Sequence, residues 1–493
     1  APGSEREAYV VGGTVRDVLL GRATRDIDVA IAGDARGWAR EAASELGAHF
    51  VTLNDEHDVA RLVLPQSDGL YVDVARLAGT VEQDARRRDF TIDALAVPLV
   101  SVPRGLKAGA TAEGEGGWKA RATGDIIDVC GGVADLDAQL VRMNGADVLD
   151  ADPLRCLRGV RLAAELGFDI EASTLAAIRE RAGSLDRAAA ERRRDELARI
   201  LEQQEAYRGV RLLDEAGLLD ELLPELAEGR GVEQPEQFHV YDVFEHNLRA
   251  VEALDEMLRP EPRGFLGAEL WRTFAWCAEE LRAYLDEPLT EGRPRVALVK
   301  LAALLHDVAK PRTRSVEGDG RTRFFGHADE GARMATAAMV RLRFSTRETE
   351  FVRVLVAEHL RPVQLAQAGE APTRRALYRF YRDLDDAAPA VLLLALADAA
   401  AARGPSMTRE GWSRQAAYMN GLLVRSKEEE GIIQPPRLVS GHDIMSVLGL
   451  PEGPAIGRLL EALREAQAAG EVHDTEEALA FVRALAREGT EEP

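Results

Sequence analysis

The segment from residue 11 to residue 30 constrains the fold of this chain more than any other part of it. The segment reads as a strand, a glycine turn that opens a short helix, and a second strand that carries Asp26 and Asp28. These carboxylates are two residues apart, so both project from one face of the strand and suit a hard cation such as Mg²⁺. Gly12 and Gly13 let backbone N–H groups approach a phosphate, and the following helix adds the positive end of its dipole. The pattern predicts a site that holds a nucleoside triphosphate through metal and backbone.

Alternating strands and helices across residues 8–100 predict an α/β head around this segment. An amphipathic helix is expected over 35–46, and strands over 9–11, 27–31, 49–52, 61–64 and 70–74. The glycine-rich stretch 105–117 lacks periodicity and predicts a mobile insertion. The chain is almost entirely helical from Pro153 onward, so the expected fold class is α+β and multidomain. We expect a head (1–145), a helical neck and body without strands (146–235), a second helical domain (236–430) and a helical tail (431–493).

Composition limits the cellular setting and the partners. The 493-residue chain is too long for one core, and its formal charge of −22 argues against indiscriminate nucleic-acid binding, although a local basic surface remains compatible with a nucleic acid partner. The three cysteines (Cys130, Cys156 and Cys277) form no paired motif, as expected in a reducing cytoplasm. No apolar run approaches a membrane span and no apolar signal segment precedes Tyr9, so we expect a cytoplasmic protein without membrane contact.

Three charged motifs follow the two aspartates. In the run Arg87-Arg88-Asp89, the arginines are suited to neutralising triphosphate oxygens and the aspartate to ordering them or meeting a ribose hydroxyl. Asp152 and Arg155 are three residues apart, so they share one face of a helix that Pro153 would begin. The two side chains are either an acceptor and donor for a base edge or an ordinary salt bridge, and the spacing alone favours the salt bridge. The third motif, Glu191-Arg192-Arg193-Arg194, is by itself a charged helix.

The order of the motifs resembles the bacterial class II tRNA nucleotidyltransferase and poly(A) polymerase family, within the DNA polymerase beta superfamily. The matching motifs span residues 9–200 and are Gly12-Gly13-x-Val15-Arg16-Asp17, Arg25-Asp26-x-Asp28, Arg87-Arg88-Asp89-Phe90-Thr91, Asp152-Pro153-x-Arg155 and Glu191-Arg192-x-Arg194-Asp195-Glu196-Leu197. The resemblance implies template-independent addition of nucleotides of the CCA terminus to the 3′ end of tRNA. It further implies CTP as a substrate and Mg²⁺ as the cofactor, with ATP left open as a second nucleotide.

The resemblance also implies a role for each motif. Asp26 and Asp28 would hold two Mg²⁺ ions, one at the attacking 3′-hydroxyl and one at the triphosphate. The superfamily adds a third carboxylate from a neighbouring strand, for which we choose Asp73. Asp152 and Arg155 would select the base by hydrogen bonds. The other expected nucleotide contacts are Gly12, Gly13, Arg16, Arg25, Arg87, Arg88, Asp89, Arg158, Arg192 and Arg194.

The sequence departs from the family pattern at three places. Asp93 stands where the family usually has asparagine, and Ala151 where it has glutamate. The passage from residue 74 to residue 82 is short, whereas many CCA-adding relatives carry a longer flexible loop there. In the family, the absence of that loop accompanies addition of only the two cytidines, so we expect CC addition. A poly(A) polymerase or an enzyme that adds only the final A is the alternative within the class.

A second set of candidate ligands lies in the helical part. His306-Asp307 follows an apolar helix, and His246 and Asp398 are the partners that complete a minimal set. This set resembles the HD phosphohydrolase superfamily, which implies a second divalent metal on these four residues, with His327 and His359 left open as further ligands. The resemblance leaves open whether the domain hydrolyses phosphate esters of RNA ends or only shapes the body.

Two alternative functions outside the nucleotidyltransferase class remain open. One is a hydrolase whose head only binds RNA ends, and the other is a noncatalytic tRNA-binding chaperone. In the tail, glycines and prolines over 449–457 precede a helix over 458–469, which either meets an RNA phosphate or forms a packing hairpin. The sequence leaves the oligomeric state and the hydrolytic substrate open.

Overall fold

The computed structural model describes residues 7–24, 26–54, 58–65, 69–102, 125–290, 292–367, 372–429 and 435–488. By its internal contacts the chain divides into two compact units. The first contains Ala1–Ile200 and Leu212–Glu221, and the second contains Leu201–Arg211 and Leu222–Pro493. A sheet in the first unit and helices in the second confirm the expected α+β class.

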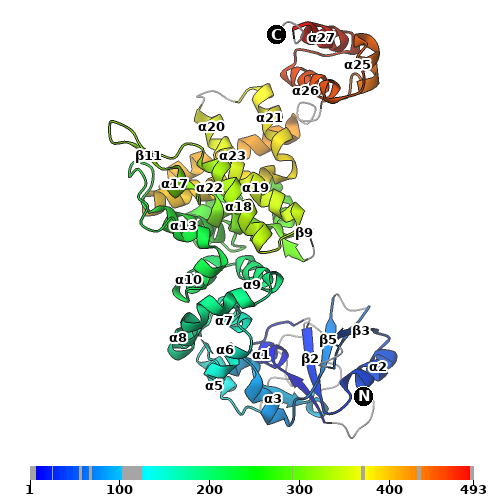
Figure 1. The fold of residues 1–493 in the computed structure, drawn as a ribbon, viewed down its shortest axis with the longest axis vertical. Coiled ribbons are helices and arrows are strands. Elements are labelled where there is room, and N and C mark those ends of the chain that lie inside the picture. The colour runs from blue at the N-terminus through cyan, green and yellow to red at the C-terminus, as the bar shows by residue number, and fades with distance from the viewer. Residues whose placement is uncertain are drawn as a thin grey trace. The chain divides into compact units, whose positions relative to one another are not determined.

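The described strands of the head form a six-stranded sheet in the order β3-β4-β5-β2-β1-β6 (Figure 1). The head elements are β1 (Ala8–Val11), α1 (Gly13–Leu19), β2 (Asp26–Ile31), α2 (Ala35–Leu46), β3 (His49–Asn54), β4 (Val59–Val63), β5 (Tyr71–Arg76), α3 (Val81–Arg87) and β6 (Ala96–Pro98). Strands β2 and β5 run parallel, and every other neighbouring pair is antiparallel. All five expected strands are present, and α2 has the expected bounds.

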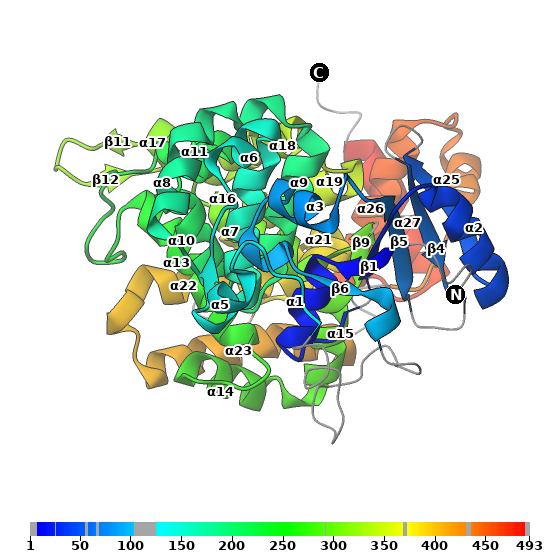
Figure 2. The same ribbon diagram turned by 90° about the horizontal axis from the view of Figure 1, so that it is seen from below.

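Side-chain alternation gives this sheet one apolar face that α2 covers and a second face that carries the carboxylates of β2. Ile31 of β2 and Leu62 of β4 pack with Trp38 of α2 in a single core, and Figure 2 shows α2 alongside β4 and β5. Because successive strand residues point to opposite faces, Asp26 and Asp28 project from the face that α2 does not cover. The packing of α2 therefore determines which face is available for chemistry.

Helices complete the first unit. They are α5 (Gly132–Asp137), α6 (Ala146–Ala151), α7 (Leu154–Leu166), α8 (Ala172–Arg181) and α9 (Ala190–Glu202). The expectation of a neck without strands is wrong, because β7 (Leu140–Val141) pairs with β8 (Asp169–Ile170). Helix α7 packs tightly on the head: a Cβ at Gly159 would lie 2.8 Å from Cζ of Phe90.

The second unit is a helical domain with two short strand pairs among its described residues. Helix α10 (Ala206–Glu215) passes from the second unit into the first at Leu212, and α11 (Leu218–Leu222) belongs to the first unit up to Glu221. The other elements of the second unit are α12 (Pro224–Ala227), α13 (Val243–Leu258), α14 (Phe265–Thr273), α15 (Ala278–Asp286), β9 (Pro288–Thr290), β10 (Arg293–Pro294), α16 (Arg295–Leu305), α17 (Lys310–Thr313), β11 (Ser315–Val316), β12 (Thr322–Arg323), α18 (His327–Arg341), α19 (Thr346–Glu358), α20 (Arg361–Gln367), α21 (Arg374–Leu384), α22 (Ala388–Arg403) and α23 (Arg409–Glu428). Helices α16 and α22 form its interior, since most of their residues are buried.

The expectation that no apolar run approaches a membrane span is wrong for one stretch. The stretch Arg374–Ser406, which contains α22, includes an 18-residue window with a mean hydropathy of 1.4, so it is long and apolar enough to cross a membrane by length and composition alone. In the structure 67% of that apolar window is buried. A helix packed on all sides inside a domain needs the same apolar composition, which explains the pattern.

The last helices form a separate core at the end of the second unit. They are α25 (Gly441–Leu448), α26 (Pro454–Ala469) and α27 (Thr475–Glu488), and Ile444, Leu463 and Val482 are buried between them. The expected glycine-rich insertion, 105–117, lies outside the described residues, as do the first four residues of the expected tail, 431–434.

Candidate active site

Three carboxylates meet on the open face of the head sheet. The parallel register of β2 and β5 places Asp28 directly beside Asp73, and oxygens of Asp26, Asp28 and Asp73 lie within 4.8 Å of one another. Asp26 Oδ1 is buried and has no hydrogen-bond partner among the described residues. Clustered carboxylate oxygens with one left unpartnered fit the oxygen-rich site that a hard divalent cation prefers.

The carboxylates of the cluster are partly buried and repel one another when they are ionised. Burial, followed by the charge of Asp26, raises the pKa of the Asp28 carboxyl to about 7. Burial and then Asp73 also raise the pKa of Asp26. A cation bound between these groups would reverse both effects, because opposite charge favours the ionised carboxyl.

The glycine turn connects the cluster to a cationic side chain. Thr14 of α1 accepts a hydrogen bond from the Asp28 N–H (2.8 Å) and donates one to the Asp26 carbonyl (3.1 Å), so it ties the turn to β2. Gly12 has φ 68°, and a Cβ there would lie 2.5 Å from Nη1 of Arg88 and 3.5 Å from Oδ2 of Asp28. The backbone of Gly12 therefore runs between a guanidinium and a carboxylate, an arrangement that would suit a metal-bound phosphate.

The other expected nucleotide contacts have mixed surroundings. Arg16 is 6% exposed and is held by Asp93 at 2.6 Å and by Asp17, so its charge is used inside the head. The Asp89 carboxylate accepts from Arg158 at 2.7 Å. Four further positions complete the set: Gly13 begins α1, Arg87 is exposed at the end of α3, Arg194 contacts Asp195, and Arg25 lies outside the described residues.

Asp152 and Arg155 do not share a helix, contrary to expectation. Helix α7 begins only at Leu154, and Asp152 is extended before Pro153, where it accepts from the Leu154 N–H. A residue before proline avoids the helical region, which explains the difference. Asp152 instead contacts Arg192 at 2.8 Å, while Arg155 donates to the Val148 carbonyl at 3.0 Å.

Two contacts beside the cluster were not expected from the sequence. Arg61 of β4 contacts both oxygens of Asp73, and its guanidinium carbon lies 3.9 Å from the centre of the Tyr71 ring. Arg61 and Tyr71 both lie on predicted strands. Their alternation with the apolar residues Leu62 and Val72 could have indicated that their side chains project from the face that carries the carboxylates. Their partners depend on the pairing of strands, which local sequence does not specify.

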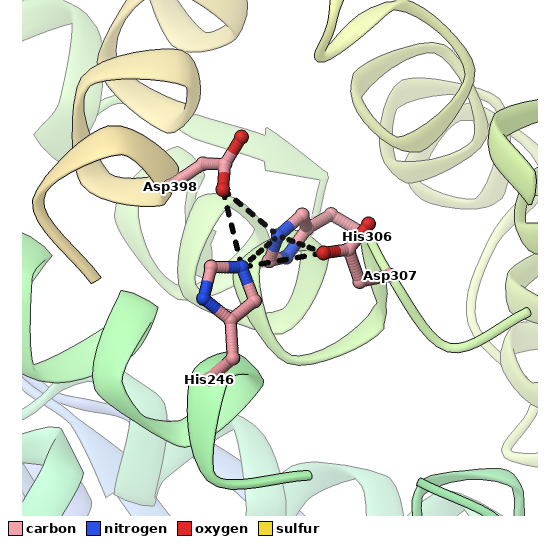
Figure 3. A group of neighbouring side chains, drawn as sticks. All are labelled: His246, His306, Asp307 and Asp398. Carbon is pink, nitrogen blue, oxygen red and sulfur yellow. Dashed lines mark hydrogen bonds and ion pairs between the residues drawn. The ribbon is translucent and has the colours of Figure 1, made fainter. Parts of the chain in front are cut away.

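A second cluster lies inside the helical domain. His246 of α13, His306-Asp307 at the end of α16, and Asp398 of α22 converge in Figure 3. His246 Nε2 lies 3.1 Å from His306 Nε2, 3.2 Å from Asp307 Oδ2 and 3.1 Å from Asp398 Oδ1. The four expected residues therefore come together from separate helices, in a group that could hold a metal ion.

Asp307 links this group to a second one. Its Oδ1 lies 3.3 Å from His327 Nε2 and 3.7 Å from His359 Nε2, so Asp307, His327 and His359 form another possible metal-binding set. The Nδ1 atoms of His306, His327 and His359 each face a backbone carbonyl at 2.7 to 2.8 Å. A carbonyl at Nδ1 fixes the tautomer that presents a lone pair at Nε2, which is the usual support of a metal-binding histidine.

Charge within the histidine cluster is divided unevenly. Burial works to lower the pKa of His306, but Asp307 and Asp398 outweigh it and raise that pKa to about 10. Burial and the neighbouring His306 lower the pKa of His359 to about 4. A proton on His306 therefore balances the buried carboxylates where a cation would otherwise do so.

Comparisons with known proteins agree with these features. Residues 8–142 match the family model of the poly A polymerase head domain, 167–229 that of the probable RNA and SrmB-binding site of polymerase A, and 269–403 that of the HD domain. The A-adding tRNA nucleotidyltransferase of Deinococcus radiodurans is 37% identical, covering 98% of this chain and 96% of that protein. The CC-adding tRNA nucleotidyltransferase of Thermus thermophilus is 36% identical, covering 97% and 93%. A solved CCA-adding enzyme in its apo form shares the fold, with 22% identity, a TM-score of 0.58, and coverage of 97% of this chain and 90% of that one.

The head and its carboxylates define a nucleotidyltransferase. More closely, the chain belongs to the family of bacterial tRNA nucleotidyltransferases that carry an HD domain. His246 precedes the range matched by the HD model, although its ring contacts the cluster inside that domain. The relatives include A-adding and CC-adding enzymes at nearly equal identity, so likeness alone does not separate the two specificities.

Proposed function

We propose that the chain adds cytidine nucleotides to the 3′ end of tRNA without a template, using CTP and Mg²⁺. The observation that supports this proposal most strongly is the carboxylate cluster beside the Gly12 turn and Arg88. Mg²⁺ held there supplies charge neutralisation at the attacking and leaving oxygens of an in-line displacement. The proposal places the chain in the cytoplasm, where tRNA is processed, and assigns the tail after residue 430 to tRNA binding.

The chain's own residues divide the work of this reaction. Asp26, Asp28 and Asp73 would hold the metal, and Thr14 would keep the first two aligned with the turn. The Gly12 backbone and the Arg88 guanidinium would bind triphosphate oxygens and orient the α-phosphate. Together these contacts would stabilise the negative charge that develops on the phosphate oxygens during the displacement.

Base choice is assigned to the start of α7. The Asp152 carboxylate accepts and the Arg155 guanidinium donates, which matches the N4 amino donor and the N3 and O2 acceptors on the pairing edge of cytosine. Asp152 already contacts Arg192, so Arg192 is proposed to hold it in place. Between Arg76 at the end of β5 and Val81 at the start of α3 only four residues intervene, which supports the expected CC addition.

Nucleotide incorporation tests this proposal directly. The chain is incubated with tRNA lacking its CCA end and with each labelled nucleoside triphosphate in turn. We expect incorporation from CTP, loss of it in Asp28→Asn, and normal folding of that variant by circular dichroism. Long tails from ATP alone would overturn the proposal in favour of a poly(A) polymerase, and a single A added only to tRNA ending in CC would favour A addition.

The histidine cluster supports a second candidate function, a metal-dependent phosphohydrolase. Asp307 belongs to both possible metal-binding sets, which together contain His246, His306, Asp307, His327, His359 and Asp398. In His306, His327 and His359, a backbone carbonyl at Nδ1 orients the ring. A divalent cation there would supply a nucleophilic water and polarise a phosphate ester. Lys310, 2.5 Å from Asp307 Oδ2, places a further positive charge beside the cluster.

Metal analysis and hydrolysis test the second candidate. We expect the purified chain to retain a transition metal and to open 2′,3′-cyclic AMP in the presence of Mn²⁺ or Ni²⁺. His306→Ala should lose both the metal and this activity while still incorporating CTP, and Asp28→Asn should show the reverse. A metal-free chain that hydrolyses nothing would leave the cluster a structural feature and remove this candidate.

A further inference from the structure

Arg61 makes the most specific contact with the carboxylate cluster. Its Nε donates to Asp73 Oδ1 and its Nη2 to Asp73 Oδ2, both at 2.7 Å. The guanidinium carbon also lies 3.9 Å from the centre of the Tyr71 ring. Burial, followed by the charge of Asp26, raises the pKa of the hydroxyl of the same tyrosine, so Tyr71 also lies near Asp26. One cation is therefore held between the Asp73 carboxylate and the ring of Tyr71.

The strand register determines this contact. Arg61 of β4 stands opposite Asp73 of β5, which stands opposite Asp28 of β2. Residues directly opposite on neighbouring strands project from the same face, so the three side chains form one row across the sheet. Lateral slippage of the guanidinium is restricted by the Tyr71 ring below it.

A two-point contact of this kind has two physical consequences. It fixes the rotamer of Asp73, because both oxygens are held in the plane of the guanidinium. Each carboxylate oxygen has a second lone pair, so the contact leaves acceptors free for a cation. The guanidinium also reduces the formal negative charge of the carboxylate cluster, since one positive charge offsets one of the three carboxylates. A nearby positive charge weakens the binding of a second cation.

We propose that Arg61 is a positioning residue of the nucleotidyltransferase centre, which aims Asp73 at Asp26 and Asp28 and limits how tightly the centre binds divalent cations. The inference rests on the proposed function of that cluster. Two properties of the Arg61 side chain have separate effects. The forked guanidinium orients the Asp73 carboxylate, and the positive charge limits the affinity of the centre for a divalent cation. Lysine at this position retains the charge without the fork, and glutamine retains neither.

Metal binding by the free protein tests the charge. Mn²⁺ is titrated into the full chain and free Mn²⁺ is measured by electron paramagnetic resonance, with the binding lost in Asp28→Asn taken as the head site. Removal of the charge is expected to make Arg61→Gln bind Mn²⁺ about threefold to tenfold more tightly than Arg61→Lys. Equal Mn²⁺ affinity in the two variants would overturn the charge assignment.

The rate of CTP incorporation tests whether Arg61 orients Asp73. Both Arg61 variants should show kcat for CTP incorporation lowered by about tenfold or more, with KM for CTP within twofold of the wild type. Arg36→Gln is the matched control, because Arg36 contacts Asp58 at 2.8 Å in the same domain, away from the cluster. Unchanged kcat in both Arg61 variants, or an equal fall in Arg36→Gln, would reduce the contact to ordinary cross-strand pairing. A wild-type chain without incorporation would refute the proposed function instead, and the Mn²⁺ affinities would still decide the role of Arg61.

Discussion

A divalent cation at the head carboxylates is expected to compete with a proton on Asp28. Burial and the charge of Asp26 raise the pKa of Asp28 to about 7. The protonated fraction then falls from roughly nine-tenths at pH 6 to roughly one-tenth at pH 8. If the cation binds only the ionised form, its apparent Kd falls by about tenfold across this interval. Metal binding should therefore release a proton near neutral pH.

The stability of the metal-free protein should change in the opposite direction. A folded-state pKa above the unfolded value favours the protonated folded state, so this contribution is fully present below about pH 4 and is lost as the pH rises through about 7. Mn²⁺ titrations at pH 6, 7 and 8 measure the first effect, with the binding lost in Asp28→Asn isolating the head site. A head-site Kd that is the same at pH 6 and pH 8 would refute the reasoning.

Three further variants test other parts of the account. Gly12→Ala places a Cβ against Arg88 at a φ that side chains rarely adopt, so we expect a loss of about 1–3 kcal/mol in urea denaturation and at least a tenfold rise in KM for CTP. Asp152→Ala should lower the preference for CTP over UTP by about tenfold while leaving the melting temperature near that of the wild type, measured by competition between the two nucleotides; unchanged preference would remove Asp152 from base selection. Glu348 is fully buried in an ion pair that lowers its pKa to about 2, so its stabilisation is complete above about pH 4.5 and is lost as the pH falls through 2. Glu348→Gln should cost about 3–5 kcal/mol at pH 7, and an equal loss at pH 2 would contradict the assignment.

Local sequence was sufficient for the strands of the head and for the face that carries Asp26 and Asp28. Period-two alternation separates the apolar residues that pack on α2 from the carboxylates, and it needs no knowledge of pairing. The contact between Arg61 and Asp73 was out of reach, because it depends on β4 lying beside β5 in one register. A shift of one residue would turn Arg61 to the opposite face.

Helix boundaries and buried networks account for the other differences. Asp152 was expected on a helix from its spacing to Arg155, but the proline that follows it keeps it extended. The convergence of His246, His306 and Asp398 followed from the motif, whereas the sequence does not encode the carbonyls that orient each ring. Those carbonyls come from the helix turns that precede the histidines, as Ala303 does for His306.

Product length at single-nucleotide resolution tests the central claim most directly. A tRNA that ends at its discriminator base is incubated with the chain, Mg²⁺, CTP and ATP together, and the extended RNA is separated on a sequencing gel. The account predicts extension by two cytidines and no further, with no extension in Asp28→Asn or in Asp73→Asn. A product one nucleotide longer that ends in adenosine, or full extension by either variant, would contradict it.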